Sequence, residues 1–458
     1  MKNHFNNFQG FQSMKKISII AVLVMISFGM HQGLLAKGDF NPIKFERDSL
    51  PNGLQIIYCI DKSAPVVSTV VHYRVGSKDE NPQRTGFAHF FEHLMFEGTT
   101  NIPRATIDKY VEEAGGWLNA HTAFDETVFK FRVPANEIKL ALWIESQRMR
   151  GLLVDSVGVE TQRGVVKEER KMRNDNTAYG TLFENMMKYL FKNTSYEWTP
   201  IGSEKHINSA SIQEFRDFYN NFYQPNNAVL AIVGDFDISE AKGYVRDYFG
   251  IYPKAPEPKR EQFHIEPLSQ PVAETIEDSK AQLPGVFIGY RGPKLGDKDY
   301  YAVSLLADIL ASGESSRMYQ RLVDKDQIAV AAQLNPINLQ YAGVIMLIGI
   351  PALGKEPQKV LEVMTEEIAK VVKSGVTDEE LTKAKNITES GFVSDKKNVL
   401  DKAQSLARYY TYFGDAGMIN NEFDKYQSVT KEDIQRVAKL YFDTPNRVVL
   451  TYMPKSKK

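Results

Sequence analysis

The segment TGFAHFFEHLMFEG, residues 85–98, carries two histidines and two glutamates among aromatic and aliphatic side chains. On an α-helix, with about 100° between successive residues, His93 lies about 40° from His89, and Glu92 lies about 60° to the other side. The three side chains therefore share one narrow face. Because the rest of the helix is apolar and buried ionisable groups need a partner, we expect a metal ion on that face.

Neutral imidazoles are good zinc ligands, and a carboxylate beside them can reach a zinc-bound water without binding the metal. We expect His89 and His93 to hold zinc, which lowers the pKa of that water, and Glu92 to take its proton. The hydroxide would then attack a polarised carbonyl. The order H-x-x-E-H is the inverted metallopeptidase motif. The alternative is a solvated helix face, or histidines satisfied by the backbone. Glu97, about 140° from Glu92, is expected to be a surface charge.

A hydrolytic zinc site needs a third protein ligand beside its open position. In ETQRGVVKEERKMRND, residues 160–175, helical periodicity places Val165, Val166 and Met172 on the inward face. Glu169 falls between them, which makes it a candidate ligand. The alternative for Glu169 is an ion pair with one of the nearby Lys or Arg residues.

The elements that position these residues form two similar halves. The chain has 458 residues, 43% of them hydrophobic, which suits two domains of about 200 residues each. Residues 211–234, SIQEFRDFYNNFYQPNNAVLAIVG, parallel residues 430–453, TKEDIQRVAKLYFDTPNRVVLTYM. Both combine an amphipathic helix, a Pro-Asn turn and an apolar strand. We therefore expect an α+β protein built by duplication, with an antiparallel-rich sheet and packed helices in each half.

Composition places the domain boundary and excludes one class of partner. The segment YPKAPEPKREQ has the prolines and mixed charge of a linker. We predict an N-terminal domain over 39–251, a linker over 252–270 and a C-terminal domain over 271–458. The formal net charge of −1 gives no electrostatic reason to expect nucleic acid as a partner.

The N-terminus has the pattern of an export signal over residues 1–36. Lys15 and Lys16 precede an apolar run from Ile17 to Met30, and cleavage after Ala36 fits the residues that follow. The run is short for a membrane span, so a membrane location is expected only if the signal stays uncleaved. We predict an exported protein, periplasmic or extracellular. The single cysteine, Cys59, lies in a strand-like run and is expected to be buried.

Several segments together resemble the pitrilysin/insulinase (M16) family of zinc peptidases, whose small members include mitochondrial processing peptidase subunits and exported bacterial proteins. They are RTGFAHFFEHLMFEGT, VVKEERKMRND, LPNGLQIIY, GGWLNAHTAFDETVF, FYQPNNAVLAIVGDFD and GESSRMYQRL. The resemblance implies two similar domains enclosing a chamber, and one zinc ion per chain. It also implies that His89, His93 and Glu169 are the ligands and Glu92 the general base.

By the same resemblance, GGWLNAHTAFDET, residues 115–127, corresponds to the family's edge strand beside the zinc. Such a strand accepts an extended peptide through backbone hydrogen bonds. We expect Asn119 to position the substrate; the alternative is an Asn that caps a turn after the Gly-Gly bend. His121 is expected to be structural.

The second half departs from the family at one pair of positions. Active members usually carry there an Arg followed seven residues later by a Tyr, and this chain has Val323 and Val330 instead. Arg321 points to another helix face and is not expected to substitute. A further departure is Gln162, where many relatives have Glu; it is expected to tune the site.

These residues predict a zinc-dependent metalloendopeptidase that cuts peptides or unfolded protein segments. The missing Arg/Tyr pair predicts that the chain is the zinc-bearing subunit of a heteromer, with a paralogous subunit supplying the pair. An active homodimer is a second possibility. The alternative function is that of a non-catalytic assembly or peptide-binding subunit.

Overall fold

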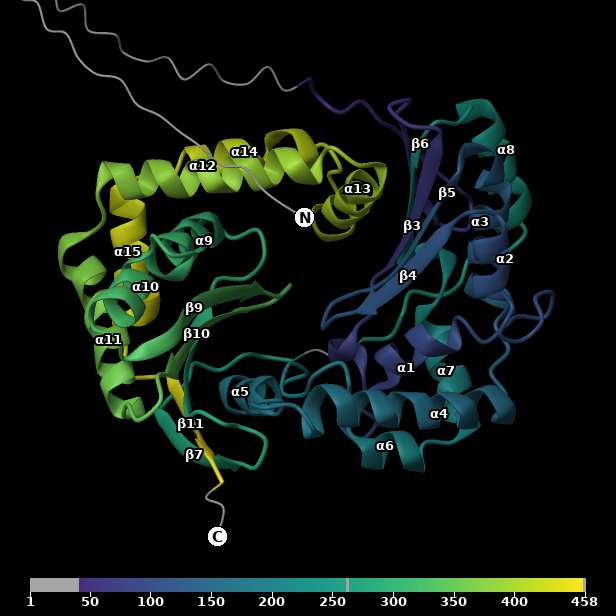
Figure 1. The fold of residues 1–458 in the computed structure, drawn as a ribbon. Coiled ribbons are helices and arrows are strands. Elements are labelled where there is room, and N and C mark those ends of the chain that lie inside the picture. Colours follow the sequence, from purple (N-terminus) through teal and green to yellow (C-terminus); the bar gives the residue numbers. More distant parts are fainter. Residues whose placement is uncertain (1–40, 261–262, 456–458) are drawn as a thin grey trace, which may run out of the picture. The chain divides into compact units, whose positions relative to one another are not determined.

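The computed structural model describes residues 41–260 and 263–455 of the chain. The predicted signal segment, 1–36, and its cleavage position lie outside these residues. The described residues from Ile43 onward form one compact unit with two sheets and many helices (Figure 1). None of the described helices is both long enough and apolar enough to cross a bilayer.

The first sheet, within the described residues, has six strands in the order β1-β2-β6-β3-β5-β4. Strands β2 and β6 run parallel, and the other neighbours are antiparallel. Strand β4 is therefore an edge strand. The strands are β1 (Glu46–Ser49), β2 (Gln55–Ile60), β3 (Val66–Tyr73), β4 (Trp117–Thr122), β5 (Thr127–Pro134) and β6 (Ala228–Gly234).

The second sheet repeats five of the six strands of the first in the same order. Its order is β7-β11-β8-β10-β9, with β7 and β11 parallel and the other neighbours antiparallel. Only a counterpart of β1 is missing from its described strands. The predicted duplication of an α+β unit is thus confirmed. The strands are β7 (Val272–Asp278), β8 (Gly285–Gly292), β9 (Ala329–Asn338), β10 (Gly343–Pro351) and β11 (Val448–Pro454).

Helices of the first half pack mainly on one face of the first sheet, where aromatic and aliphatic side chains form a large buried core. The sheet also buries Cys59, as expected, and burial raises the pKa of its thiol to about 11. The helices are α1 (Phe87–Leu94), α2 (Ile107–Glu113), α3 (Ile138–Gly151), α4 (Ser156–Arg170), α5 (Leu182–Leu190), α6 (Glu204–Ser209), α7 (Ile212–Phe222) and α8 (Ile238–Phe249).

The second half has its own helical core around its sheet. Its helices are α9 (Lys298–Ala311), α10 (Arg317–Tyr319), α11 (Pro357–Ser374), α12 (Asp378–Asp395), α13 (Val399–Phe413), α14 (Met418–Gln427) and α15 (Lys431–Phe442). Between α8 and β7 the described residues form neither helix nor strand. The predicted boundary over 252–270 stays a prediction.

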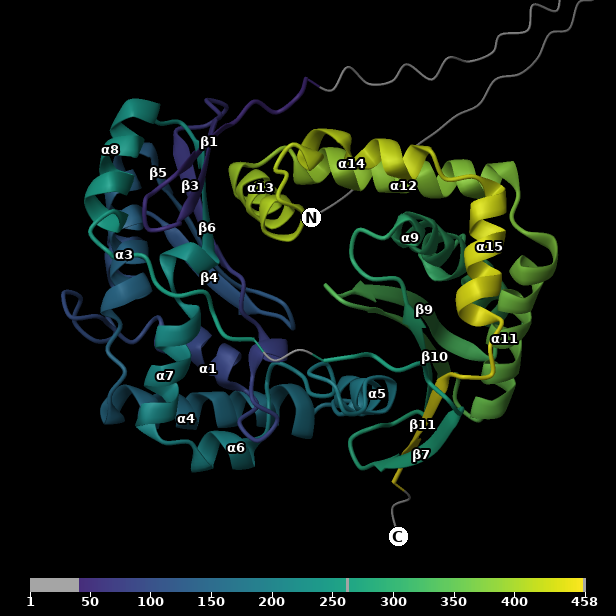
Figure 2. The same ribbon diagram turned by 180° about the vertical axis from the view of Figure 1, so that it is seen from behind.

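The two halves exchange one helix each. Helix α5 of the first half packs on the second sheet, where Met186 and Leu190 share a core with Leu450. Helix α13 of the second half packs on the first sheet, where Leu406 shares a core with Val70. Figures 1 and 2 show α13 beside β3 and β6 from both sides. Each sheet is therefore covered on one face by a helix from the other half.

Candidate metal centre

Helix α1, which carries the H-x-x-E-H residues, is short and fixed by aromatic packing. It follows Gly86, whose φ of 97° favours glycine. Phe87 and Phe90 stack on Phe215 of α7, with ring centroids 4.5 and 4.6 Å apart. Since an isolated helix of this length is unstable in water, this tertiary packing must hold it in place. The predicted burial of its apolar face is confirmed.

A buried carboxylate caps the beginning of α1. Glu80 accepts hydrogen bonds from the backbone amides of Gly86 and Ala88, both at 2.8 Å, and from the indole of Trp198 at 3.0 Å. Burial raises the pKa of Glu80 to about 8, although these hydrogen bonds oppose the shift. The sequence analysis missed Glu80. One signal was available in the sequence: the helix begins after Gly86, which has no side chain to cap it, so another residue has to accept hydrogen bonds from its first amides.

The structure brings three of the sequence-predicted side chains together. His89 Nε2 and His93 Nε2 lie 3.3 Å apart. Glu169 Oε2 of α4 lies 3.4 Å from His89 Nε2 and 3.0 Å from His93 Nε2. In the described part of the chain, these residues form the one group of three or more potential ligands whose donor atoms all lie within 4.8 Å of one another.

Glu169 reaches this group on a face of α4 that matches the expected inward face only in part. Val166 is buried, but Val165 and Met172 are 45% and 71% exposed, so the prediction that both face inward is wrong. A π-helical turn, Lys171–Asp175, follows α4 and changes the periodicity around Met172. The alternative interpretation of Glu169 is confirmed in part, because its Oε1 lies 2.9 Å from Nη1 of Arg173. Its Oε2 faces the histidines, and its role as a ligand stays a prediction.

The donor set fits a zinc ion. Glu169 Oε2 is buried and has no hydrogen-bond partner of good geometry among the described residues, although two imidazole nitrogens lie beside it. The histidines hold the pKa of the Glu169 carboxyl well below its ordinary value, against the effect of burial. An ionised carboxylate and two imidazoles that converge on one point are zinc donors, and a cation there would satisfy the orphaned oxygen.

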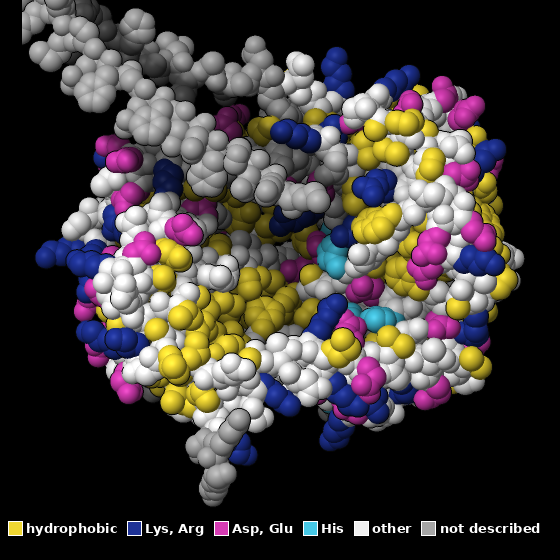
Figure 3. Space-filling view, in the orientation of Figure 1, with side chains coloured by type: hydrophobic (Ala, Val, Ile, Leu, Met, Phe, Trp, Pro, Cys, Tyr) yellow, Lys and Arg dark blue, Asp and Glu magenta, His cyan; other side chains and the backbone are white. Residues whose placement is uncertain are grey.

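Glu92 lies on the same helix but has a separate partner. Its Oε2 accepts a hydrogen bond from the hydroxyl of Thr122, at 2.7 Å. Thr122 is the last residue of edge strand β4. The carboxylate therefore stands between the helix that carries the histidines and the strand predicted to receive substrate. Histidine side chains, with acidic ones beside them, reach the surface near a hollow (Figure 3).

Asn119 is exposed on β4, and its Oδ1 accepts a hydrogen bond from the amide of Ala120 at 2.7 Å. It thus lies within a strand and not in the Gly115–Gly116 bend. His121 is outside the metal group and contacts Glu126 at 3.1 Å. Although burial disfavours the carboxylate, His72 together with His121 and Tyr412 of α13 holds the pKa of Glu126 well below its ordinary value.

Glu97 corrects a prediction. It lies beyond the end of α1 at Leu94, is only 8% exposed, and is not a surface charge. Its Oε1 accepts from the Gln162 amide at 2.7 Å, and its Oε2 accepts from Arg104 at 3.1 Å. The helical wheel misled because the helix ends before Glu97. Gln162 is thus a hydrogen-bond partner of Glu97.

The two valines that replace the family's Arg/Tyr pair lie in different environments. Val323 packs against the second core, and Val330 on β9 is 53% exposed. Neither can donate a hydrogen bond from its side chain. Arg321 is held by Asp326, with Nε and Oδ2 2.5 Å apart, and lies 3.7 Å from Glu367. The expectation that Arg321 does not replace the missing Arg stays a prediction.

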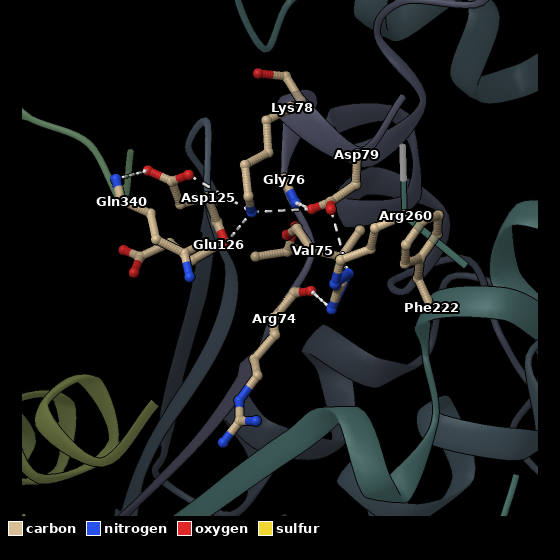
Figure 4. Close-up of polar contacts among 12 residues, drawn as sticks. Arg74, Val75, Gly76, Lys78, Asp79, Asp125, Glu126, Phe222, Arg260 and Gln340 are labelled. Carbon is tan, nitrogen blue, oxygen red and sulfur yellow. Dashed lines mark hydrogen bonds and ion pairs between the residues drawn. The ribbon is translucent and has the colours of Figure 1, made fainter. Parts of the chain in front are cut away.

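A buried polar cluster, which sequence reasoning missed, fixes the turn that follows β4 (Figure 4). Lys78 Nζ lies 3.2 Å from Asp79 and 3.5 Å from Asp125 Oδ1. Asp125 also accepts from the backbone amide of Gln340, in the turn between β9 and β10, at 2.9 Å. Arg260 lies 3.2 Å from Asp79. The cluster thus ties the edge-strand hairpins of both sheets to the segment between the halves.

Two family models match the chain. The model "Insulinase (Peptidase family M16)" matches residues 56–202, which include all three candidate ligands and Glu92, and "Peptidase M16 inactive domain" matches residues 209–388.

Among curated proteins, the chain is 29% identical to zinc protease PqqE of Helicobacter pylori, over 89% of this chain and 92% of that one. It is 25% identical to an uncharacterized zinc protease of Streptomyces coelicolor, over 88% and 89%. Among solved structures, a protease from Helicobacter pylori superposes with a TM-score of 0.85 at 27% identity, covering 90% of this chain and 100% of that one. The first half of the Escherichia coli periplasmic protease PqqL, at 20% identity and a TM-score of 0.75 over 91% and 93%, shares the fold.

Proposed function

The chain belongs to peptidase family M16, and from this premise we propose that it is a zinc-dependent metalloendopeptidase acting on peptides or unfolded protein segments. The observation that carries the proposal is the convergence of His89, His93 and Glu169 beside Glu92. A closed ligand group alone could be structural. The adjacent carboxylate, held by a different partner, gives the site a group that can move a proton.

Each residue has a role in the proposed reaction. Zinc, when bound, supplies Lewis acidity toward water and the peptide carbonyl. Glu92 takes a proton from the attacking water and returns it to the departing amine. Strand β4 binds the substrate in extended form through its free edge, because main-chain groups there have no neighbouring strand among the described residues. We assign substrate positioning to Asn119, whose side chain is exposed on that strand.

We also propose that the chain works with a paralogous subunit. At Val323 and Val330 the second half offers no side-chain donor to a developing oxyanion, and removing one such donor typically costs about 10²- to 10³-fold in rate. A paralogue that carries the Arg/Tyr pair would supply this function. A homodimer is the other arrangement under test. We propose an exported location on the strength of the N-terminal pattern alone.

Metal analysis and peptide cleavage test the proposed activity. We expect stoichiometric zinc in the unmutated protein and in Glu92→Gln, but cleavage lower by about 10²-fold or more in the variant. Glu169→Gln should lose zinc, whereas Glu168→Gln, which changes the adjacent exposed carboxylate, should keep both zinc and cleavage. Unmutated protein without stoichiometric zinc would contradict the proposal and favour the non-catalytic peptide-binding function.

The heteromer is tested by purification of the chain alone and together with a paralogue that has R-x6-Y and lacks H-x-x-E-H. We expect cleavage to rise sharply on mixing. Full cleavage by the chain alone would contradict the proposal of a heteromer. Gel filtration would then show whether the active species is a homodimer.

A further inference from the structure

We propose that Thr122 is a positioning residue that orients the Glu92 carboxylate for proton transfer. The inference rests on the proposed function, because it assigns a role within the same reaction. The Thr122 Oγ1 to Glu92 Oε2 distance is 2.7 Å, a short hydrogen bond between a hydroxyl donor and a carboxylate acceptor.

The hydrogen bond distinguishes the two oxygens of Glu92. A hydroxyl has one proton to donate, and Thr122 donates it to Oε2. Glu92 Oε1 has no hydrogen-bond partner among the described residues, so it is the oxygen available to water. In the proposed step an O–H bond of water breaks, an O–H bond to Oε1 forms, and the water oxygen bonds to the peptide carbon. When the C–N bond breaks, the proton passes from Oε1 to the departing amine nitrogen.

The position of Thr122 also links the base to the substrate strand. Along β4, the side chains of Leu118 and Ala120 pack against buried clusters of the first half. Thr122 continues this alternation and so faces α1, whereas Asn119 lies on the opposite face. A peptide that pairs with the edge of β4 would therefore be aligned along the same strand whose last residue, Thr122, holds the Glu92 carboxylate. A shift of this strand would move the bound peptide and the Glu92 carboxylate together.

The alternative is that the hydrogen bond only satisfies the Thr122 hydroxyl. Thr122→Val removes the donor with little change in shape, and Thr122→Ser restores it. The matched control is Thr69→Val on β3, because the hydroxyl of Thr69 is buried and has no partner among the described residues. All variants are prepared as the full chain, with the paralogous subunit present if cleavage requires it.

We expect Thr122→Val to keep zinc and KM but to lower kcat by about 10- to 100-fold, the range expected when a reacting group is misplaced. Thr122→Ser should recover most of the rate, and Thr69→Val should match the unmutated protein. Equal kcat in Thr122→Val and the unmutated protein would overturn the inference, as would a Thr122→Ser variant no faster than Thr122→Val.

A second measurement separates this inference from the proposed function. If the unmutated protein cleaves no peptide even with its partner, the proposed function fails. The contact is then tested by the denaturation midpoints of Thr122→Val, Glu92→Ala and the double variant. We expect non-additive shifts, because each single change breaks the same hydrogen bond. Additive shifts would overturn the role of Thr122 independently of cleavage.

Discussion

At the scale of the residue, the properties of the candidate metal centre depend on pairs of side chains in contact with each other. One carboxylate oxygen of Glu169 lies beside the histidines, and the other forms an ion pair with Arg173. Glu97 and Gln162 form a second pair, in which the amide of Gln162 donates to a buried carboxylate. A glutamate at position 162 would instead set two carboxylates against each other, with Arg104 as the nearby cation.

Gln162→Glu therefore has a predictable pH dependence. Like charges in contact raise the pKa of the pair in the folded state, so the variant loses stability as pH rises through that raised pKa and regains it in acid. We expect a deficit of about 1–3 kcal/mol at pH 8 that shrinks by pH 4.5. Urea denaturation at both pH values measures it.

Gln162→Leu is the control for this prediction, since it removes the same hydrogen bond without adding charge. Its deficit should vary little between the two pH values. If Gln162→Glu and Gln162→Leu follow the same pH dependence, carboxylate repulsion is not the cause.

At the scale of the element, α1 depends on a cap distant in sequence from its first residue. Glu80 accepts two amide protons at the beginning of the helix, where helical amides lack intrahelical partners. Burial raises its pKa from 4.5 to about 8, so the folded protein binds this proton more tightly than the unfolded chain. The contribution of Glu80 to stability must then fall as pH rises between about 4.5 and 8.

Glu80→Gln should remove this dependence, because the amide resembles the protonated carboxyl and does not titrate. Relative to the unmutated protein, the variant should gain stability with rising pH, by at most about 1.4 kcal/mol per pH unit within the window. Denaturation at pH 5, 6.5 and 8 checks the slope. Glu112→Gln, an exposed change on α2, is the control. If the difference in free energy of unfolding between Glu80→Gln and the unmutated protein is the same at all three pH values, the raised pKa of Glu80 is contradicted.

Elements also show where sequence reasoning ends. The residues from His89 to His93 could be placed on one face because they span little more than one helical turn. The repeat of 211–234 in 430–453 predicted the matching sheets, since both halves close with the same helix and strand. Met172 was misplaced because helical periodicity holds only as far as the helix does, and a π turn follows α4. Glu80 was missed because its partners are fixed by tertiary packing.

At the scale of the whole molecule, the exchange of α5 and α13 makes the halves interdependent. Sequence periodicity shows that each helix has an apolar face but does not reveal which sheet that face will cover. Lys402 of α13 also pairs with Asp61, which follows β2. The linker-like composition at 252–270 therefore does not show that the two halves on either side of it are stable when separated.

A cut within 252–270 tests this interdependence. We expect a protein cleaved there by an inserted protease site to keep its halves associated in gel filtration, because each half contributes a helix to the other's core. The two halves expressed separately should aggregate, since each exposes a large apolar sheet face. A soluble, cooperatively unfolding N-terminal half would contradict this expectation.

The exchange of helices also sets the order in which the chain can fold. The face of the first sheet formed by Ile57, Val70 and Val229 meets its cover only when residues 399–413 arrive. The contacts of Ile57 and Val70 with residues 399–413 span more than 300 residues, and such long-range closure is slow and leaves incomplete chains with exposed apolar surface. A growing chain thus cannot complete early the half that carries His89, His93 and Glu169. That half reaches its final form only after residues 399–413 have been synthesised.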